Sequence, residues 1–568
     1  MPSHTVHFVD LLVQHAETFA DKPIYLFLED GEEIKEQITY QQLKDRAAAL
    51  AVTLRQHHPE GSRVLLLYPS CIDYMVAFFG CLAAGMVAVP IFPPRSSKHN
   101  QRLLTVMQDS GATVALTTRS QLALMQGHAQ GLLEQVHLVC TDEVDAALSS
   151  QWSPPEITLE TLAFLQYTSG STGDPKGVMV THGNLLYNQQ MLQTSFHPDE
   201  DTVYVTWLPI YHDMGLMGNM LHAFWAGGMC YFMTPAVFLR RPLCWLTAIS
   251  RYRATISGAP NFAYQLCTDR IKEAQKEGLD LRSWKVAFNG AEPVRHSTLQ
   301  AFQKAFASCG FQSKAFVCCF GMAESTLIAT GGTPFEEPIF LTVDPVALSR
   351  KQVVVAEDGI TLVACGRALL EETVRIIHPE TLQECEADEV GEIWLTGKHV
   401  CKGYYGRPEA TRETFEAMLD GSPHLRTGDL GFVHGGQLYV AGRLKDTIIL
   451  NGVNHYPQDI EATIETADPA IRGAGVAVFA LQGELSEKVV AVAEVERTLM
   501  RSIQPAELTL KIRQKVLEAH DLMVSEVVLI LPMSLPKTSS GKVQRSLTRQ
   551  MYLAGELSTL DARMAALT

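Results

Sequence analysis

Several motifs and composition features are missing from this chain, and each absence removes a class of protein. Its twelve cysteines include no C-x-x-C pair, and Cys318 and Cys319 are merely adjacent. Neither a disulfide framework nor a zinc site is therefore indicated, and we expect reduced thiols in a cytoplasmic protein. Basic residues are also scarce, since 46 of them against 62 acidic residues leave a net charge of −16. This acidity predicts no nucleic-acid partner, because nothing would attract a polyanion to the chain as a whole.

No unbroken apolar stretch marks a signal peptide or a membrane span. Acidic side chains interrupt the N-terminal region where a signal peptide needs a continuous apolar run. Residues 74–92, YMVAFFGCLAAGMVAVPIF, are uncharged and long enough to cross a bilayer, but Gly80, Gly85 and Pro90 break them. Residues 86–91 have the character of a short buried strand. We therefore expect a buried helix followed by a strand, and no stable membrane insertion.

The patterns that are present favour a large protein of the α/β class. With 568 residues, of which 46% are apolar, the chain is long enough for two to four domains with a substantial core. Short apolar runs that predict buried strands cover residues 62–70, 111–118 and 136–142. Helical patterns lie between them, over residues 40–56 and from Asn100. This alternation predicts a large N-terminal domain of doubly wound sheets.

The character of the sequence changes further along the chain. Residues 391–397, 437–443 and 446–452 have the period-two patterning and glycine turns of strands, which predicts a β-rich subdomain. Beyond Asn454 a helix, a strand and another helix are expected, as in a small α+β domain. We place the boundary near Gly442–Asp446.

One loop carries the composition of a phosphate site. Residues 165–180, LQYTSGSTGDPKGVMV, combine glycines and hydroxyl side chains with a lysine, but they lack the G-x-x-x-x-G-K-[ST] spacing of the common nucleotide loop. An apolar strand, residues 163–167, precedes the loop, and a helical pattern begins near His182. Inward backbone amides and hydroxyls would form a nest for a polyphosphate. A flexible glycine and serine surface turn explains the composition equally well.

Two further motifs end predicted strands with a glycine and an acid. They are NGAEP, residues 289–293, and FGMAEST, residues 320–326. Ligands of open α/β sheets bind at the carboxyl ends of strands, so both motifs lie where a site is expected. Phe320 offers an aromatic face, and Glu324 offers a hard oxygen ligand for Mg²⁺.

Two more glycine motifs complete the set. RTGDLG, residues 426–431, places Asp429 in a glycine turn, where its carboxylate would accept hydrogen bonds from two ribose hydroxyls. LPKTSSGKVQRS, residues 535–546, places Lys542 in a second lysine-bearing glycine loop. Over nearly the whole chain, these five motifs in this order resemble the adenylate-forming superfamily of acyl-CoA synthetases, peptide-synthetase adenylation domains and luciferases.

The resemblance implies a nucleotide site built from these motifs. The residues that would hold the ATP phosphates are Thr168, Ser169, Gly170, Ser171, Thr172, Gly173 and Lys176. The residues that would frame the adenine are Asn289, Gly290, Ala291, Glu292, Phe320, Gly321 and Met322. Asp429 and Arg443 would fix the ribose, and Glu324 with Thr172 would position Mg²⁺.

The resemblance also implies the catalytic groups and a hinge. Lys542 resembles the family's catalytic lysine, which a mobile C-terminal domain brings to the carboxylate and the α-phosphate; Thr168 and Lys176 would act on the phosphates. Lys445 occupies the hinge position, which divides the chain into residues 1–444 and 445–568. Attack of a carboxylate on a phosphate brings two anions together, so Mg²⁺, a lysine and backbone donors are the catalysts such a step needs.

Two neighbouring residues have less certain roles. His212, in LPIYHDMGL, resembles a site histidine that family members place between the acyl and nucleotide pockets, although a structural histidine at a strand end is an alternative. Asp213 beside it has no required role, and helix capping is the better explanation of this carboxylate, with a site role as the alternative.

Within the superfamily, several stretches look most like the fatty acyl-AMP ligases, among them WLPIYHDMGLMG and ATISGAPNFAYQLC. Residues 340–363 resemble the insertion that hinders completion of a CoA site in those ligases, although an ordinary surface hairpin would also explain the segment. The resemblance implies ATP- and Mg²⁺-dependent activation of a fatty acid, followed by transfer to the phosphopantetheine arm of an acyl carrier protein in trans, since the chain has no L-G-G-x-S carrier motif.

Three other functions are alternatives to this one. A fatty acyl-CoA synthetase is the main alternative. A peptide-synthetase adenylation domain is disfavoured because no F-D-x-S motif occurs near residues 208–216, and a non-catalytic ATP-binding regulator is disfavoured because Lys542 and Glu324 are both present. Uncharged residues near the expected site suit an alkyl chain, although core packing explains them too: Met214, Leu216, Met217, Met220, Met233 and Phe262.

Overall fold

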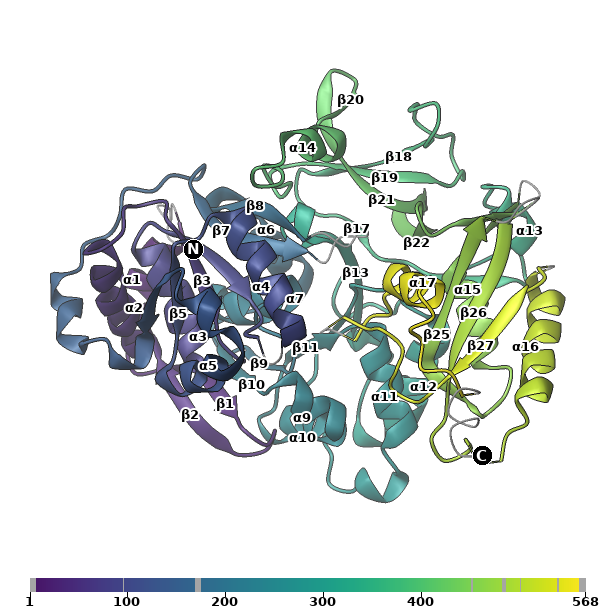
Figure 1. The fold of residues 1–568 in the computed structure, drawn as a ribbon, viewed down its shortest axis with the longest axis horizontal. Helices are drawn as coiled ribbons and strands as arrows, with labels where there is room; N and C mark the ends of the chain where they lie inside the picture. Colours follow the sequence, from purple (N-terminus) through teal and green to yellow (C-terminus); the bar gives the residue numbers. More distant parts are fainter. Residues whose placement is uncertain are drawn as a thin grey trace.

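The computed structural model describes residues 7–94, 97–168, 175–450, 453–482, 487–500, 502–520, 522–538 and 541–560. Two large sheets and a smaller β-rich sheet form the bulk of the molecule, and a separate small unit closes one side of it (Figure 1). This arrangement confirms the predicted α/β class.

The larger sheet has nine strands and is parallel in its centre. In spatial order these are β17 (Arg367–Ala368), β14 (Ile328–Gly331), β13 (Phe316–Gly321), β12 (Val286–Asn289), β11 (Ile256–Ala259), β9 (Val203–Thr206), β10 (Met229–Phe232), β1 (Pro23–Leu28) and β2 (Ile34–Thr39). The pairs from β13 to β1 are parallel, and the outer strands β17, β14 and β2 are antiparallel to their neighbours. The carboxyl ends of β12 and β13 therefore meet at one edge.

The second sheet has six strands. In spatial order these are β6 (His137–Cys140), β5 (Val114–Thr117), β3 (Arg63–Leu67), β4 (Val87–Ile91), β7 (Leu162–Thr168) and β8 (Lys176–Thr181). One expectation needs correction: the strand β6 is not buried, because it lies at the edge of the sheet with His137 exposed. The antiparallel strand β8 follows the glycine loop, and the helix expected near His182 begins at that residue.

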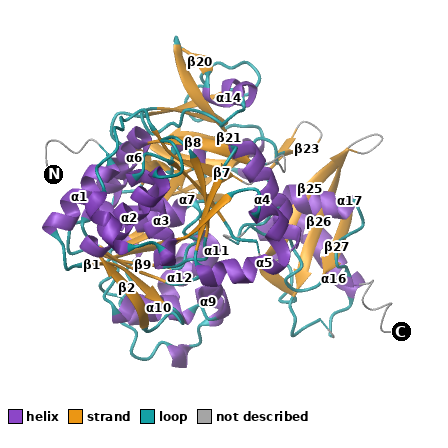
Figure 2. Cartoon of the chain, turned by 60° about the vertical axis from the view of Figure 1, so that its left-hand side comes forward, coloured by secondary structure: helices purple, strands orange, loops and turns teal. Residues whose placement is uncertain are grey.

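Helices cover both faces of these sheets (Figure 2). Their bounds are α1 (Phe8–Thr18), α2 (Tyr40–Arg55), α3 (Ile72–Ala83), α4 (Ser97–Ser110), α5 (Arg119–Leu133), α6 (His182–Phe196), α7 (Asp213–Gly215), α8 (His222–Ala226), α9 (Pro235–Arg240), α10 (Leu243–Arg251), α11 (Asn261–Arg270) and α12 (His296–Phe306). Residues 74–92 form most of α3 and all of β4, which confirms the predicted helix–strand pair. Every side chain of α3 except Asp73 is buried, because the helix packs against α2 and the sheet.

A β-rich sheet stands above the two large ones in Figure 1. Its strands are β18 (Thr373–Ile377), β19 (Gly391–Thr396), β21 (Ser422–His434), β20 (Ala417–Leu419) and β22 (Gln437–Arg443), and α14 (Pro408–Phe415) packs beside it. Neighbouring strands in this sheet are antiparallel, as the period-two patterning predicts.

The segment expected to be an insertion forms a compact unit. Its ends pair as the antiparallel strands β15 (Phe340–Val343) and β16 (Ile360–Val363), and α13 (Pro345–Ser349) lies in the connection between them. Val343 and Leu348 are buried in one apolar cluster with Tyr456, which belongs to the C-terminal region. The carbonyl of Ser349 also accepts a hydrogen bond of 3.0 Å from the Asn454 side-chain amide. The segment therefore ties the β-rich sheet to the residues that follow the expected hinge.

The C-terminal residues build a small α+β unit with its own core. Its elements are β23 (Ile448–Leu450), β24 (Val453–His455), α15 (Pro457–Glu465), β25 (Ile471–Gln482), β26 (Glu487–Val495), α16 (Pro505–His520), β27 (Glu526–Ile530) and α17 (Arg545–Leu553). Buried apolar residues from Ile448 to Leu560 pack with one another in a cluster separate from the main core. In Figure 1, α17 lies on the side of this unit that faces the large sheets.

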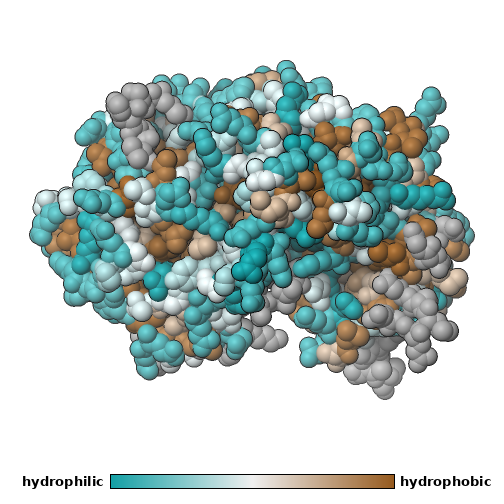
Figure 3. Space-filling model, turned by 90° about the horizontal axis from the view of Figure 1, so that it is seen from above, coloured by the Kyte–Doolittle hydropathy of each residue, from teal (hydrophilic) through white to brown (hydrophobic). Residues whose placement is uncertain are grey.

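No helix in the described ranges is both long and apolar enough to cross a membrane. On the face seen in Figure 3, hydrophobic patches are small and interrupted by hydrophilic residues.

Candidate active site

One cavity of about 2230 Å³ lies between the large sheets and the C-terminal unit. The predicted site residues that line it are Thr168, Lys176, His212, Ala291, Glu292, Phe320, Gly321, Met322, Glu324, Asp429, Arg443, Lys445 and Lys542. Five further predicted residues, Ser169, Gly170, Ser171, Thr172 and Gly173, lie outside the described ranges. The structure thus gathers side chains separated by up to 374 positions in sequence, from Thr168 to Lys542, around a single space.

Two predicted adenine residues lie behind the cavity wall rather than on it. Asn289 is fully buried, and its amide nitrogen lies 3.4 Å from the Asn261 side-chain oxygen. Gly290 packs closely against Cys319. Glu292, two residues further along, does reach the cavity, and its carboxylate accepts a hydrogen bond of 2.6 Å from the backbone N–H of Phe262.

The glycine loop is anchored at both ends by the hairpin that carries it. Thr168 and Lys176 are register partners at the open end of β7 and β8, so both side chains stand where the loop begins and ends. The Lys176 ammonium lies 4.7 Å from the centre of the Tyr404 ring, a cation–π contact.

Tyr404 also holds Glu324, the expected magnesium ligand. Its hydroxyl donates a hydrogen bond of 2.8 Å to the Glu324 carboxylate, and burial raises the pKa of Glu324. Tyr404 was not predicted to belong to the site, because it lies 80 residues from Glu324 in sequence. Within the described ranges no group of three or more His, Cys, Asp or Glu is arranged to hold a metal ion.

The side chains of His212 and Asp213 are in contact at the cavity wall. The Nδ1 atom of His212 lies 2.5 Å from the Asp213 carboxylate. Burial would raise the pKa of Asp213, but His212 and the nearby Lys542 outweigh it and hold that pKa at about 2. Asp213 is therefore an anion at neutral pH and lies within the site, a position for which the sequence provided only a weak expectation.

Lys542 enters the cavity from the C-terminal unit. Its loop is closed by hydrogen bonds between Thr538 and Lys542, and Gly541 adopts a φ of +89°, with no room for a β-carbon beside the Phe262 ring. Burial lowers the pKa of Lys542, while Asp213 and Glu292 act against that shift because their charges favour the ammonium.

Asp429 and Arg443 lie opposite each other on two neighbouring strands of the β-rich sheet. They are register partners on β21 and β22, and the Arg443 Nε donates a hydrogen bond of 2.9 Å to the Asp429 carboxylate. The charge of Asp429 raises the pKa of Arg443. Asp429 lies on a strand rather than in the predicted glycine turn, because β21 continues through the motif from Ser422 to His434.

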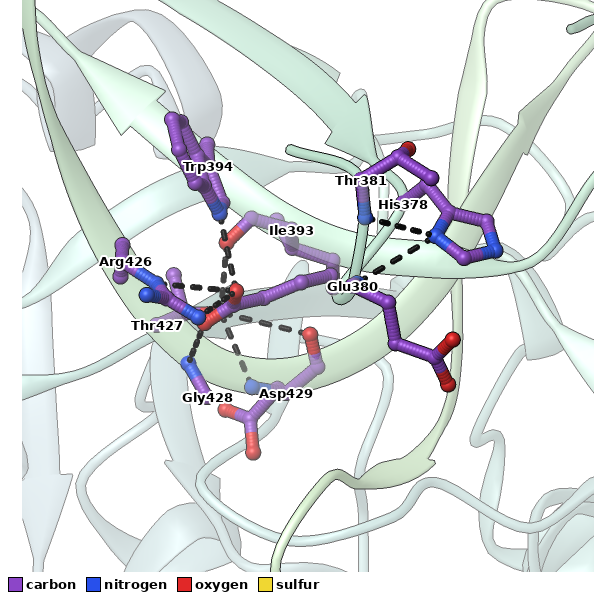
Figure 4. A network of polar contacts seen from close by, with 10 residues as sticks. His378, Glu380, Thr381, Ile393, Trp394, Arg426, Thr427, Gly428 and Asp429 are labelled. Carbon is purple, nitrogen blue, oxygen red and sulfur yellow. Dashed lines mark hydrogen bonds and ion pairs between the residues drawn. The ribbon is translucent and has the colours of Figure 1, made fainter. Parts of the chain in front are cut away.

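A buried carboxylate fixes the part of β21 that carries Asp429. Glu392 is 2% exposed; it accepts hydrogen bonds from the Arg426 guanidinium at 2.8 Å, the Trp394 indole at 3.0 Å and the Gly428 backbone at 3.2 Å. Figure 4 shows Trp394, Arg426 and Gly428 converging beside Asp429. The sequence could have indicated this contact, because Glu392 stands two residues before Trp394 in GEIWLTG. Residues two apart in a strand point to the same face of the sheet.

Charged contacts join the C-terminal unit to the rest of the molecule. Arg295, which follows Glu292 closely in sequence, pairs with Glu465 of α15 at 2.7 Å. Within the C-terminal unit, the Arg545 guanidinium donates two hydrogen bonds to the Glu461 carboxylate, each 2.6 Å between nitrogen and oxygen. The α15 helix is thus joined to Arg295, which precedes α12, through Glu465 and to Arg545, which follows the lysine loop, through Glu461.

The cavity wall contains two cysteines. Cys319 and Cys365 both line the cavity, and burial raises the pKa of each thiol to about 12. Both side chains are therefore neutral thiols at physiological pH.

The expected acyl-chain residues are only partly at the cavity. Met214 and Phe262 line it, whereas four others are buried in the main core and do not belong to the lining: Leu216, Met217, Met220 and Met233. Apolar lining residues that sequence reasoning missed come from α6 and from the strand region, and they include Leu192, Phe196, Phe288, Leu327 and Ile328.

The model of a family described as AMP-binding enzyme matches residues 12–405, and that of the Disco-interacting protein 2-like AMP domain matches residues 445–562. The medium-chain-fatty-acid–[acyl-carrier-protein] ligase JamA of Moorena producens is 39% identical, and the alignment covers 98% of this chain and 96% of JamA. The corresponding ligase TtuA of Teredinibacter turnerae is 36% identical over 94% of this chain and 91% of TtuA.

Solved structures of fatty acyl-adenylate ligases are also similar to this chain. A fatty acyl-adenylate ligase from L. pneumophila, in complex with acyl adenylate and pyrophosphate, is 38% identical with a TM-score of 0.76, covering 98% of this chain and 97% of that one. A structure from work on fatty acyl-adenylate ligases of E. coli and L. pneumophila has a TM-score of 0.85 at 29% identity, covering 97% of this chain and 98% of that one.

Removing the Glu392 carboxylate tests its structural role. We expect Glu392→Ala to lower the free energy of unfolding by about 3 kcal/mol, because it leaves the buried Trp394 indole and the partly buried Arg426 guanidinium without this partner. Glu384→Ala is the matched control, since its pair with Arg375 is exposed and such pairs contribute about 0–1 kcal/mol. Urea unfolding of both variants measures the difference, and equal losses would contradict the role.

Proposed function

The chain belongs to the AMP-binding enzyme family, and from that premise we propose that it activates a fatty acid with ATP and then transfers the acyl group to a carrier protein. In the first step a carboxylate oxygen attacks the α-phosphorus and the bond to the β-phosphate breaks. Diphosphate is released, and an acyl-adenylate is formed. In the second step the thiol of a phosphopantetheine arm attacks the acyl carbon, loses its proton and displaces AMP.

The observation that carries this proposal is the position of Lys542. Its ammonium comes from the C-terminal unit and enters the cavity among the carboxylates of Asp213, Glu292 and Asp429. An anion attacking another anion needs a fixed positive charge at the point where negative charge develops. The pairs His212–Asp213 and Arg443–Asp429 keep the surrounding charges fixed during that step.

The same proposal assigns roles to the remaining site residues. Asp429 and Arg443 bind the ribose, and Ala291, Glu292 and Phe320 to Met322 contact the adenine. Thr168 and Lys176 bind the phosphates at the ends of the glycine loop. Lys445 is the hinge, exposed between β22 and β23, and residues 445–568 form the mobile C-terminal domain.

Glu324 fits a magnesium site of the kind used with nucleotides. Mg²⁺ keeps several waters and takes one or two carboxylates together with substrate phosphates, rather than a cage of protein ligands. A single buried carboxylate at the cavity wall, oriented by Tyr404, matches that donor set. When bound, the ion would neutralise phosphate charge. The residues described above would orient the substrates.

The acceptor is a carrier protein supplied in trans rather than CoA, and the reaction takes place in the cytoplasm. Support for the acceptor comes from residues 340–363, because Val343 and Leu348 share an apolar cluster with Tyr456 beyond the hinge. This contact resists rotation of the C-terminal domain, on which a CoA site would depend. A fatty acyl-CoA synthetase is the second candidate, since the adenylation site would be the same in both.

One experiment separates these functions. The protein is incubated with ATP, Mg²⁺ and radiolabelled fatty acids, and either CoA or a holo-carrier protein is added. We expect acyl-AMP that persists with CoA and is consumed by the carrier. Rapid formation of acyl-CoA would favour the synthetase, and no adenylate from any acid would refute both. Lys542→Ala is the control, with adenylate formation about 10²–10³-fold slower.

The Arg295–Glu465 pair allows a charge-reversal test of the domain arrangement. Arg295→Glu and Glu465→Arg each replace the 2.7 Å ion pair by two like charges, so we expect each to slow adenylate formation, about tenfold. The double variant restores opposite charges and should recover most of the rate. Stopped-flow measurement of diphosphate release provides the test; a double variant no faster than either single one would contradict it.

Loosening residues 340–363 tests their effect on the acceptor. Leu348→Ala combined with Asn454→Ala removes part of the apolar cluster and the hydrogen bond to Ser349. We expect acyl-CoA formation to rise several-fold while adenylate formation is unchanged. Val346→Ala is the control, because that side chain is exposed on the same segment. Equal CoA activity in all three proteins would argue against the proposed role.

A further inference from the structure

One side of the cavity is lined by apolar side chains, and we call this part the apolar arm. Its walls include Leu192, Phe196 and Phe288. Because these three side chains are at most 3% exposed, they are packed on their other sides and present only a small part of their surface to the cavity. Such an arm suits the alkyl chain of a substrate whose carboxylate lies near Lys542.

The ring of Phe196 is held in place at this arm. It stacks on the Phe288 ring with centroids 5.2 Å apart and an angle of 14° between the planes. Phe288 itself rests on the backbone of Gly258, where an added β-carbon would lie 2.2 Å from its ring. The hydroxyl of Ser195 donates a hydrogen bond of 3.0 Å to the Gly332 carbonyl and fixes the end of α6. Neither ring is free to swing away from a long chain.

On another side, Phe196 covers a buried polar layer. Its ring meets that of His222 edge-on with centroids 5.9 Å apart, and His222 is fully buried. The Nδ1 atom of His222 lies 2.7 Å from the Gln189 side-chain oxygen, and the Gln189 amide donates to the Met217 carbonyl at 3.2 Å. Burial lowers the pKa of His222 to about 3, so the imidazole is neutral.

We propose that Phe196 is the floor of the apolar arm and limits the length of the fatty acid that the enzyme accepts. This inference rests on the proposed function and extends it to the selection of substrate. A chain that ends before Phe196 is covered by apolar side chains along its length. A longer chain would have to displace a ring packed between Phe288 and His222, and would then reach the polar layer beneath it.

The test compares adenylate formation across a ladder of saturated acids from hexanoic to octadecanoic. Phe196→Ala should extend the accepted range, raising kcat/KM about tenfold or more for the first acid beyond the wild-type limit, as one methylene group in an apolar pocket does. Phe196→Leu should shift the profile in the same direction by less, and Phe196→Trp should shift it toward shorter acids. All variants are measured in the full-length protein with ATP and Mg²⁺.

Phe306→Ala is the matched control for lost packing. Phe306 is also a fully buried phenylalanine at the last position of a helix, α12, but it does not line the cavity. We expect it to lower the unfolding temperature and leave the chain-length profile unchanged. Folded Phe196 variants with the wild-type profile would overturn the inference. Wild-type protein that forms no adenylate from any acid would instead refute the proposed function, so the two failures are distinguishable.

Discussion

The structure depends on one electrostatic arrangement, a lysine ammonium placed among carboxylates that belong to other parts of the chain. Asp213 begins the helix α7, Glu292 lies in the connection after β12, Asp429 belongs to the β-rich sheet, and Lys542 comes from the C-terminal unit. Without the lysine these acids would lose a cation that lies near all three of them, and Arg443 and Arg295 would remain beside Asp429 and Glu292 respectively. The position of the C-terminal unit and the charge balance of the cavity are therefore coupled.

The β-sheets position the polar groups of the cavity, because strand ends and paired strands bring them close together. The carboxyl ends of β12 and β13 are adjacent because their strands are parallel neighbours. The hairpin β7–β8 presents both ends of the glycine loop together, and β21–β22 pairs Asp429 directly with Arg443. In each case a backbone ladder, rather than a flexible loop, determines where the polar group stands.

Sequence reasoning succeeded where the signal was local. The alternation of apolar runs, the glycines that end strands and the lysine-bearing loops all depend on nearby residues, and the α/β class followed from them. It was weaker where the partner lies far away in sequence: Tyr404 meets Glu324 only through the fold. The acyl-chain residues were misjudged because Met217 and Met220 turn toward the core, whereas Phe196 on α6, with no motif to mark it, lines the cavity.

The two cysteines of the cavity wall have a consequence for the fate of the product. An acyl-adenylate is a mixed anhydride, and the nucleophile that opens it fastest is a thiolate. Because Cys319 and Cys365 remain protonated thiols, with pKa values near 12, they are poor competitors for the activated acyl group. The cavity is thus lined by sulfur atoms in their less nucleophilic form, which favours transfer of the acyl group to a thiol that arrives from outside.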